Sequence, residues 1–319
     1  MNHMITPENA SKRLRRPSVE NNPMLSLACG EIAGVLALII RTVGPSYRAV
    51  GASMVFSKCG DRFGSLSSGC IEADLAIHAD KVRETNVPQR VLYGQGSPFI
   101  DIQLPCGGGL EILLLPQPSL SELALISAVE IDRKPTNISI DLASGKITAG
   151  SFADTQLNHD QFILRLIPSI KFVVFGKGPE ACTFVKLTQS LGYLGTLVSP
   201  DSETLTKAKL AGWSMKQIFH PHSPEDIDLD DRTAVLCFFH DHEWEAPILK
   251  DVVGGETFYI GCQGSMRTRD NRMAELSSMG VSAAQLDKIH GPIGLIPSVR
   301  DSNTLAVSVL AEILSLESV

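Results

Sequence analysis

The sequence predicts an α/β protein with two domains, a small α+β domain followed by a domain built on a parallel sheet. The chain has 319 residues, which is enough for two domains of ordinary size. Up to Pro118, short apolar runs are separated by loops rich in glycine and serine. From Lys171 onward, apolar runs alternate with helical patterns, which is typical of a parallel sheet with helices on both faces.

Composition and charge narrow the class of protein. Hydrophobic residues make up 44% of the chain and charged residues 20%, the balance of a soluble globular protein. The formal net charge of −7 argues against an extended nucleic-acid-binding surface. The longest apolar run, residues 32–40, is interrupted by Gly34 and is far short of the roughly 20 residues that span a bilayer. We therefore expect neither a nucleic-acid partner nor a membrane helix.

The cysteines indicate a reducing compartment. Their number, 7, is odd, they are spread along the chain, and no C-x-x-C pair is present. A disulfide framework or a structural zinc site would need a different pattern, so the cytoplasm is the expected setting. Residues 1–22 are polar and lack the apolar segment of a signal peptide, and they are expected to form a disordered tail.

The small α+β domain is expected over residues 23–118. Apolar residues at helical spacing predict a helix from Cys70 to about Glu84. Turn signals such as Gly44-Pro45 separate the predicted strands, over residues 35–43, 52–57, 62–66, 90–93, 100–104 and 110–115. Residues 119–168 are expected to form a connecting region with a helix, a hairpin and a strand, over residues 122–132, 136–149 and 162–167.

A loop of small residues, 64–69, precedes Cys70. Cys70 is predicted to lie in the first turn of the helix, where free backbone N–H groups and the helix dipole favour a thiolate or an anionic ligand. Glu72 opposes this effect, because a second negative charge nearby is unfavourable. The alternative interpretation is a helix cap beside a buried structural cysteine.

A second loop joins a cysteine to small residues. It reads Pro105-Cys106-Gly107-Gly108-Gly109 and leads into the apolar run 110–115. Three consecutive glycines are useful where the chain must turn sharply or let a ligand approach its backbone. Two such loops in one domain suggest a single site.

The second domain is expected over residues 169–319. Its predicted strands cover 172–175, 196–198, 234–239 and 257–260, and its predicted helices cover 180–191, 202–210 and 302–314. Gly176, Gly178 and Ala181 follow the first strand in the spacing of the dinucleotide fingerprint, which predicts a Rossmann-like fold. The fingerprint also expects an acidic residue that binds the ribose at the end of the second strand. The candidate, Asp201, comes about two residues later than expected and after a proline, so NAD(P) is weakly supported as a cofactor.

Two further loops follow strands of this domain. His240 and Asp241, with His242, come directly after an apolar strand, and a polar pocket lining is favoured over a metal site because two histidines alone bind metal weakly. Gly264 and Ser265 lead into a helix that carries Arg267 and Arg269. These residues predict an anion site at a helix start, and the alternative is that both arginines are solvated.

Several separate motifs, in order, resemble the XdhC/CoxI family. They are G-S-L-S-S-G-C-I-E ending at Glu72, P-C-G-G from Pro105, G-S-x-R-T from Gly264, H-G-P-I-G-L from His290, and the closing apolar helix. The resemblance covers roughly residues 30–115 and 170–316. It implies an N-terminal XdhC/CoxI-type α+β domain and a C-terminal Rossmann-like domain.

The resemblance also implies a function. Members of that family are accessory proteins that bind molybdenum cofactor, a molybdopterin, for xanthine dehydrogenase and related molybdenum hydroxylases. The bound cofactor would receive its terminal sulfur with help from a cysteine desulfurase. On this interpretation the protein is a chaperone, and no catalytic residue is assigned.

Taken together, the loops and the resemblance predict a molybdenum cofactor site between the two domains. Cys70 and Cys106 would face the molybdenum, either as soft ligands or as groups that protect its sulfido form. The predicted cofactor-binding residues are Ser67, Gly69, Cys70, Glu72, Cys106, Gly107, Gly108, Gly176, Gly178, His240, Asp241, Gly264, Ser265 and Arg267.

Two other functions stay open at this point. One is an NAD(P)-dependent oxidoreductase that uses the loop at Gly176, although no proton-relay residue is evident beside it. The other is a ligand-sensing Rossmann module that regulates a partner. The sequence also leaves open which hydroxylase is served and whether the chain forms a homodimer.

Overall fold

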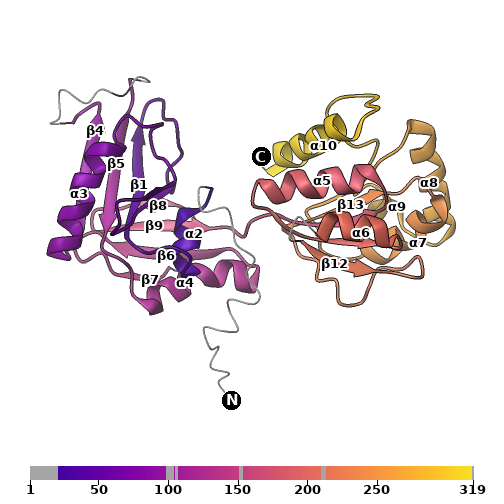
Figure 1. Ribbon diagram of the computed structural model, residues 1–319, viewed down its shortest axis with the longest axis horizontal. Helices are drawn as coiled ribbons and strands as arrows, with labels where there is room; N and C mark the ends of the chain where they lie inside the picture. Colours follow the sequence, from indigo (N-terminus) through magenta and orange to yellow (C-terminus); the bar gives the residue numbers. More distant parts are fainter. Residues whose placement is uncertain (1–20, 98–103, 105–106, 151–153, 210–212, 318–319) are drawn as a thin grey trace, which may run out of the picture. The chain divides into compact units, whose positions relative to one another are not determined.

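The computed structural model describes residues 21–97, 104, 107–150, 154–209 and 213–317 (Figure 1). The chain divides after Pro168 into two compact units, which we call unit 1 and unit 2. No helix within the described ranges is long and apolar enough to cross a membrane.

Unit 1 contains a five-stranded antiparallel sheet in the order β3-β2-β1-β5-β4. Its strands are β1 (Val35–Val43), β2 (Ser53–Phe56), β3 (Arg62–Phe63), β4 (Gln89–Gly94) and β5 (Gly109–Leu115). Side chains alternate between the two faces of a strand. In β1, Ala37 and Ile39 therefore pack with helix α3 (Glu72–Thr85), whereas Leu36 and Leu38 point into a second core on the opposite face.

That second core includes residues 119–168, the segment expected to be a connecting region. Helix α4 (Leu120–Asp132) contributes Ile126, and a four-stranded sheet in the order β7-β6-β9-β8 contributes Ile138 and Phe162. The strands of this sheet are β6 (Thr136–Asp141), β7 (Ile147–Ala149), β8 (Gln156–Leu157) and β9 (Gln161–Leu166). The segment is thus an integral part of unit 1, because its apolar side chains share a core with β1. A short helix, α2 (Pro23–Ala28), which the sequence analysis did not predict, packs there as well.

Unit 2 contains a six-stranded parallel sheet in the order β12-β11-β10-β13-β14-β15, which confirms the predicted Rossmann-like fold. The strands are β10 (Lys171–Gly176), β11 (Leu194–Ser199), β12 (Ser214–Gln217), β13 (Thr233–Phe238), β14 (Tyr259–Cys262) and β15 (Ile289–His290). Alternate side chains of each strand enter two different cores; Phe172 packs on one face and Val173 on the other.

Helices cover both faces of this sheet (Figure 1). One face is covered by α5 (Pro179–Ser190), α6 (Ser202–Lys209) and α10 (Ser302–Glu317). The other is covered by α7 (His242–Val252) and α8 (Met266–Ser278), and α9 (Ala283–Leu286) follows α8. The chain builds outward from β10 to β12 and then, starting again beside β10, from β13 to β15. A parallel sheet with this reversal has a crevice at the carboxyl ends of the two central strands, β10 and β13.

Candidate functional site

One end of unit 1 gathers the small-residue loops singled out in the sequence. Asp74, in the first turn of α3, accepts a hydrogen bond of 2.5 Å from the hydroxyl of Tyr93 near the end of β4. Strand pairing places Gly94 opposite Gly109, the first residue of β5. The N-terminus of α3 and the glycines before β5 therefore lie at the same end of the unit. We call this region the loop end of unit 1.

Glu72 organises the first of these loops. Its carboxylate, in a side chain only 6% exposed, accepts hydrogen bonds from five donors. The donors are the hydroxyls of Ser65 and Ser67 and the backbone N–H groups of Leu66, Ser67 and Ile71, at 2.7 to 3.1 Å. Burial alone would raise the pKa of Glu72, but the hydrogen bonds from Ser67 and Ser65 outweigh it and lower that pKa to about 2. The carboxylate thus provides hydrogen-bond acceptors for N–H groups of the loop, in addition to repelling an anion.

Cys70 is exposed, so the alternative of a buried structural cysteine is wrong. Its backbone N–H donates to the buried Ser67 hydroxyl at 3.1 Å, and α3 begins two residues later, at Glu72. Gly69 has a φ of +99°, a backbone conformation that favours glycine, and Ser68 shares the left-handed region at +61°. The loop therefore presents the Cys70 thiol to solvent from a fixed backbone.

The second loop is described in part. Gly107 has a φ of +69°, and the carbonyl of Gly108 accepts a hydrogen bond of 3.1 Å from the N–H of Gln95. Gly108 also lies so close to the backbone of Pro45 that a side chain there would collide with it. Cys106, predicted to face the molybdenum, lies outside the described residues.

Unit 2 has a pocket of about 940 Å³ at the carboxyl edge of its sheet, which we call the edge pocket. Segments that follow β10, β13, β14 and β15 contribute to it, as expected for the crevice. Three predicted site residues line it: His240, Gly264 and Ser265. Its other lining residues are Glu180, Phe239, Gln263, Met266, Thr268, Pro292, Ile293, Gly294, Ile296, Pro297, Ser298, Val299, Arg300, Asp301 and Leu305.

The predicted glycine loop lies beside this pocket, but its Gly178 amide is used within the protein. The N–H of Gly178 donates to the hydroxyl of the buried Thr204 at 2.9 Å. That hydroxyl in turn donates to the carboxylate of Asp201, which also accepts the Thr204 N–H at 2.8 Å. Hydrogen bonds from Thr204 lower the pKa of Asp201. One loop amide and the acid considered for a ribose are therefore already connected to each other through Thr204.

Gly176 and Asp241 were also predicted to bind the cofactor. In the structure, each has a role in the fold. A side chain at Gly176 would come within 2.8 Å of Phe238, so glycine allows β10 and β13 to approach. Asp241 caps α7 by accepting the N–H of Glu243 at 3.1 Å, and its carboxylate lies 3.8 Å from the ammonium of Lys177. Neither residue lines the edge pocket.

At the edge pocket, His240 faces two polar partners. Its Nε2 atom lies 3.7 Å from Oε1 of Glu180 and 3.2 Å from the side-chain amide nitrogen of Gln263. The same amide donates to the carbonyl of Phe239 at 3.4 Å. Within the described ranges, no group of three or more His, Cys, Asp or Glu side chains could hold a metal ion.

A buried arginine holds the turn between β14 and α8. Arg272 is 2% exposed; its Nε and Nη2 atoms lie 2.9 and 3.0 Å from the two carboxylate oxygens of Glu245. Nη2 also donates to the carbonyl of Gln263 at 2.7 Å. The turn that forms one wall of the pocket is thus tied to α7 by a forked ion pair. The sequence analysis did not identify either residue.

Neither of the two arginines predicted for an anion site, Arg267 and Arg269, lines the edge pocket. Ser265 does cap α8, accepting the N–H of Thr268 at 3.2 Å. Arg267 is exposed and is not a lining residue of the pocket, whereas Arg300, from the segment before α10, is one. The cation predicted for this pocket is therefore contributed by a different segment.

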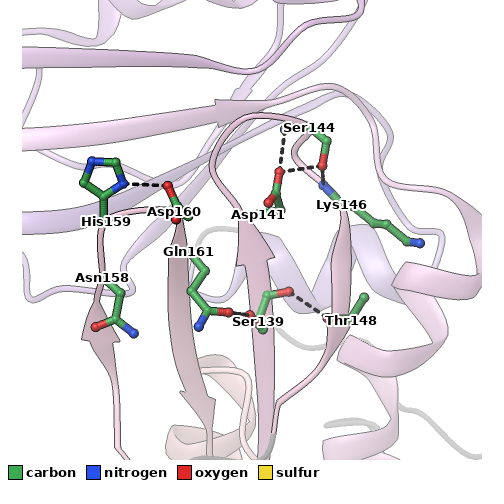
Figure 2. A pocket seen from close by; sticks show the side chains of 9 residues that line it. All are labelled: Ser139, Asp141, Ser144, Lys146, Thr148, Asn158, His159, Asp160 and Gln161. Atoms are coloured by element: carbon green, nitrogen blue, oxygen red, sulfur yellow. Dashed lines mark hydrogen bonds and ion pairs between the residues drawn. The ribbon is translucent and has the colours of Figure 1, made fainter.

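A second hollow, of about 520 Å³, lies on the four-stranded sheet of unit 1 (Figure 2). Its polar side chains bond to one another: Ser139 to Gln161 at 2.8 Å, and His159 to Asp160 at 2.6 Å. Both His159 and Asp160 are highly exposed. This is the pattern of a solvated sheet face, and we assign it no ligand.

Comparisons with known proteins agree over most of the chain. A family model described as the XdhC Rossmann domain matches residues 172–313, and one described as the XdhC and CoxI family matches residues 30–94. The molybdenum cofactor insertion chaperone PaoD of Escherichia coli (strain K12) is 32% identical over 284 residues, which cover 88% of this chain and 83% of that protein.

Two further similar proteins come from Bacillus species. A probable xanthine dehydrogenase subunit of Bacillus subtilis (strain 168) is 24% identical over 325 residues, covering 88% of this chain and 92% of that protein. A crystal structure described as a xanthine dehydrogenase from Bacillus halodurans superimposes with a TM-score of 0.77. That match covers 94% of this chain and 96% of the other at 22% identity, and it shows a shared fold.

Proposed function

The chain belongs to the XdhC and CoxI family, and from this premise we propose that it binds molybdenum cofactor as cargo. It carries the cofactor to a molybdenum hydroxylase of the xanthine dehydrogenase type and catalyses no turnover of its own. The relative at 32% identity is a cofactor insertion chaperone, which supports this role over most of the chain's length.

One observation carries the proposal, namely the edge pocket beside a glycine loop whose Gly178 amide already has a partner within the protein. The pocket, at about 940 Å³, lies at the upper end of the range that small-molecule sites occupy. Its lining combines hydrogen-bonding groups with apolar walls, as a cofactor with polar and flat parts requires. Because the Gly178 amide is bonded to Thr204, the loop is a poor place for the pyrophosphate of NAD(P).

The loop end of unit 1 supplies the sulfur chemistry of the proposal. Thiolates are soft ligands that suit a metal carrying sulfur. Cys70 is exposed on a loop that Glu72 holds in place, which supports a role for its thiol toward the molybdenum end of the cofactor. In the full proposal Cys106 assists it, and a cysteine desulfurase provides the terminal sulfur before the cofactor is delivered.

Anaerobic equilibrium binding of molybdenum cofactor to the purified full chain tests this function, with NADH and NADPH titrated in parallel. We expect stoichiometric cofactor binding and little affinity for either nucleotide. Nucleotide binding without cofactor binding would contradict the chaperone role and favour a ligand-sensing or oxidoreductase function.

A cysteine substitution tests the role of the thiol. Cys70→Ala is expected to bind the cofactor more weakly and to yield less active hydroxylase in a reconstitution assay. Cys59→Ala is the matched control, because Cys59 is also exposed but lies in the turn between β2 and β3. If both variants retained the cofactor equally well, the proposed role of the Cys70 thiol in cofactor binding would be wrong.

A further inference from the structure

Glu180 is the acidic side chain from the first turn of α5 that lines the edge pocket. It was not among the predicted site residues. Its side chain is 23% exposed, and Oε1 lies 3.7 Å from Nε2 of His240, which follows β13. The helix dipole favours a carboxylate at this position, in the first turn of α5.

This carboxylate lies where a nucleotide-binding fold receives a phosphate. In such folds the pyrophosphate binds at the helix N-terminus, next to the second glycine of the loop. Here the Glu180 carboxylate is close to Gly178: a Cβ atom on that glycine would be 3.7 Å from Oε2. An anionic ligand group would be repelled at this spot, whereas a group with N–H donors would be attracted.

Molybdenum cofactor carries such a group. The pyrimidinone edge of a pterin presents a ring N–H and an exocyclic amino N–H side by side, and a carboxylate can accept both with its two oxygens. Two parallel bonds to an ionised acceptor are stronger and more specific than single neutral ones. Phe239 and Ile293 are among the apolar residues that line the same pocket, and apolar side chains of this kind suit a flat ring.

We propose that Glu180 is the residue of the edge pocket that recognises the pterin, by accepting the N–H groups of its aminopyrimidinone edge. The phosphate of the cofactor would be repelled from the position beside Glu180 and would need another part of the pocket. This inference rests on the proposed function, since it states which part of the molybdenum cofactor Glu180 binds.

A pair of ligands that differ at one position tests this assignment on the full chain. Neopterin phosphate carries the 2-amino group, and the corresponding lumazine phosphate carries an oxygen there instead. Loss of a hydrogen bond to an ionised acceptor predicts that the wild type prefers the pterin by roughly 10- to 100-fold in Kd. In Glu180→Gln the preference should nearly vanish, because an amide offers one acceptor and one donor and can pair with either ring.

Glu203→Gln is the matched control. Glu203 lies on α6 with a side chain 74% exposed, outside the edge pocket, and its substitution should leave the preference unchanged. A wild-type chain that binds both ligands equally, or an unchanged preference in Glu180→Gln, would overturn the inference. Retention of molybdenum cofactor by the wild type in those cases would leave the chaperone function standing, so the two failures are distinguishable.

Discussion

At the residue scale, the Glu72 side chain determines the conformation of the loop that precedes Cys70. Its carboxylate accepts hydrogen bonds from both sides of the loop that ends in Cys70, so the loop conformation depends on a single acceptor. An unpaired amide left by its removal would be costly, because buried donors need partners. Glu72 is therefore a positioning residue for Cys70, and it acts through the backbone and the serine hydroxyls of the loop.

Glu72→Gln is expected to destabilise unit 1 by about 1–3 kcal/mol at neutral pH, because an amide can satisfy only part of the donor set. Hydrogen exchange at the amides of residues 65–71 should become faster, and alkylation of Cys70 should change in rate. Glu84→Gln, an exposed substitution on the same helix, should alter neither. Unchanged exchange in Glu72→Gln would contradict the positioning role.

The same substitution has a pH signature. The pKa of Glu72 is about 2 in the folded protein and about 4.3 in an unfolded chain. Its stabilising contribution is therefore complete above about pH 4.5 and is lost as the pH falls toward 2. The difference in unfolding free energy between wild type and Glu72→Gln should shrink across this window, and a constant difference would argue against an ionised Glu72.

At the scale of elements, the turn between β14 and α8 depends on a buried ion pair. Arg272 and Glu245 come from two helices on one face of the sheet and meet beneath the Gln263 carbonyl. Removing one partner of such a pair leaves an uncompensated buried charge. The wall of the edge pocket is thus supported from α7, an element that the sequence analysis did not predict.

Arg272→Met is expected to destabilise unit 2 by about 3–5 kcal/mol, which is the usual cost of stranding one buried charge. Arg269→Met, on the same helix with a side chain 39% exposed, should cost under about 1 kcal/mol. Urea unfolding followed by the fluorescence of Trp213 and Trp244 measures both. The double variant Arg272→Met/Glu245→Leu should recover most of the loss, and no recovery would mean that the pair acts through packing instead.

The elements that the sequence predicted are those with a clear local pattern. Residues 35–43 were predicted as a strand and form β1, because the run is apolar throughout most of its length and a glycine-proline turn ends it. Helix α7 escaped prediction because Pro247 lies inside it and hides its periodicity. Arg300 and Arg272 were also missed, since the first lies in an irregular segment and the second pairs across a distance of 27 residues. Contacts of this kind arise from tertiary structure alone.

The whole molecule consists of two units with separate hydrophobic cores. The two cores of unit 2 draw only on residues from Ile170 onward, and the two cores of unit 1 only on residues before Ile167. Each unit therefore buries its apolar surface without help from the other within the described residues, as an independently folding domain does.

A fragment that starts at Ser169 is accordingly expected to fold on its own. It contains both tryptophans of the chain, so a cooperative urea transition in their fluorescence would report its folding. The full chain should then show two separable transitions by calorimetry. A fragment that gives the circular dichroism of an unfolded chain would mean that unit 1 is needed for the fold of unit 2.

The hydrogen bond from Gly178 to Thr204 affects how well pyridine nucleotides could compete for this protein inside a cell. Pyridine nucleotides are abundant metabolites, and a carrier with an open nucleotide loop would be occupied by them most of the time. Here a single threonine hydroxyl, buried and shared with Asp201, occupies one amide of that loop, which would weaken a pyrophosphate site there. Under the proposed chaperone function, the loading of this protein would then follow the supply of molybdenum cofactor and not the redox state of the nucleotide pool.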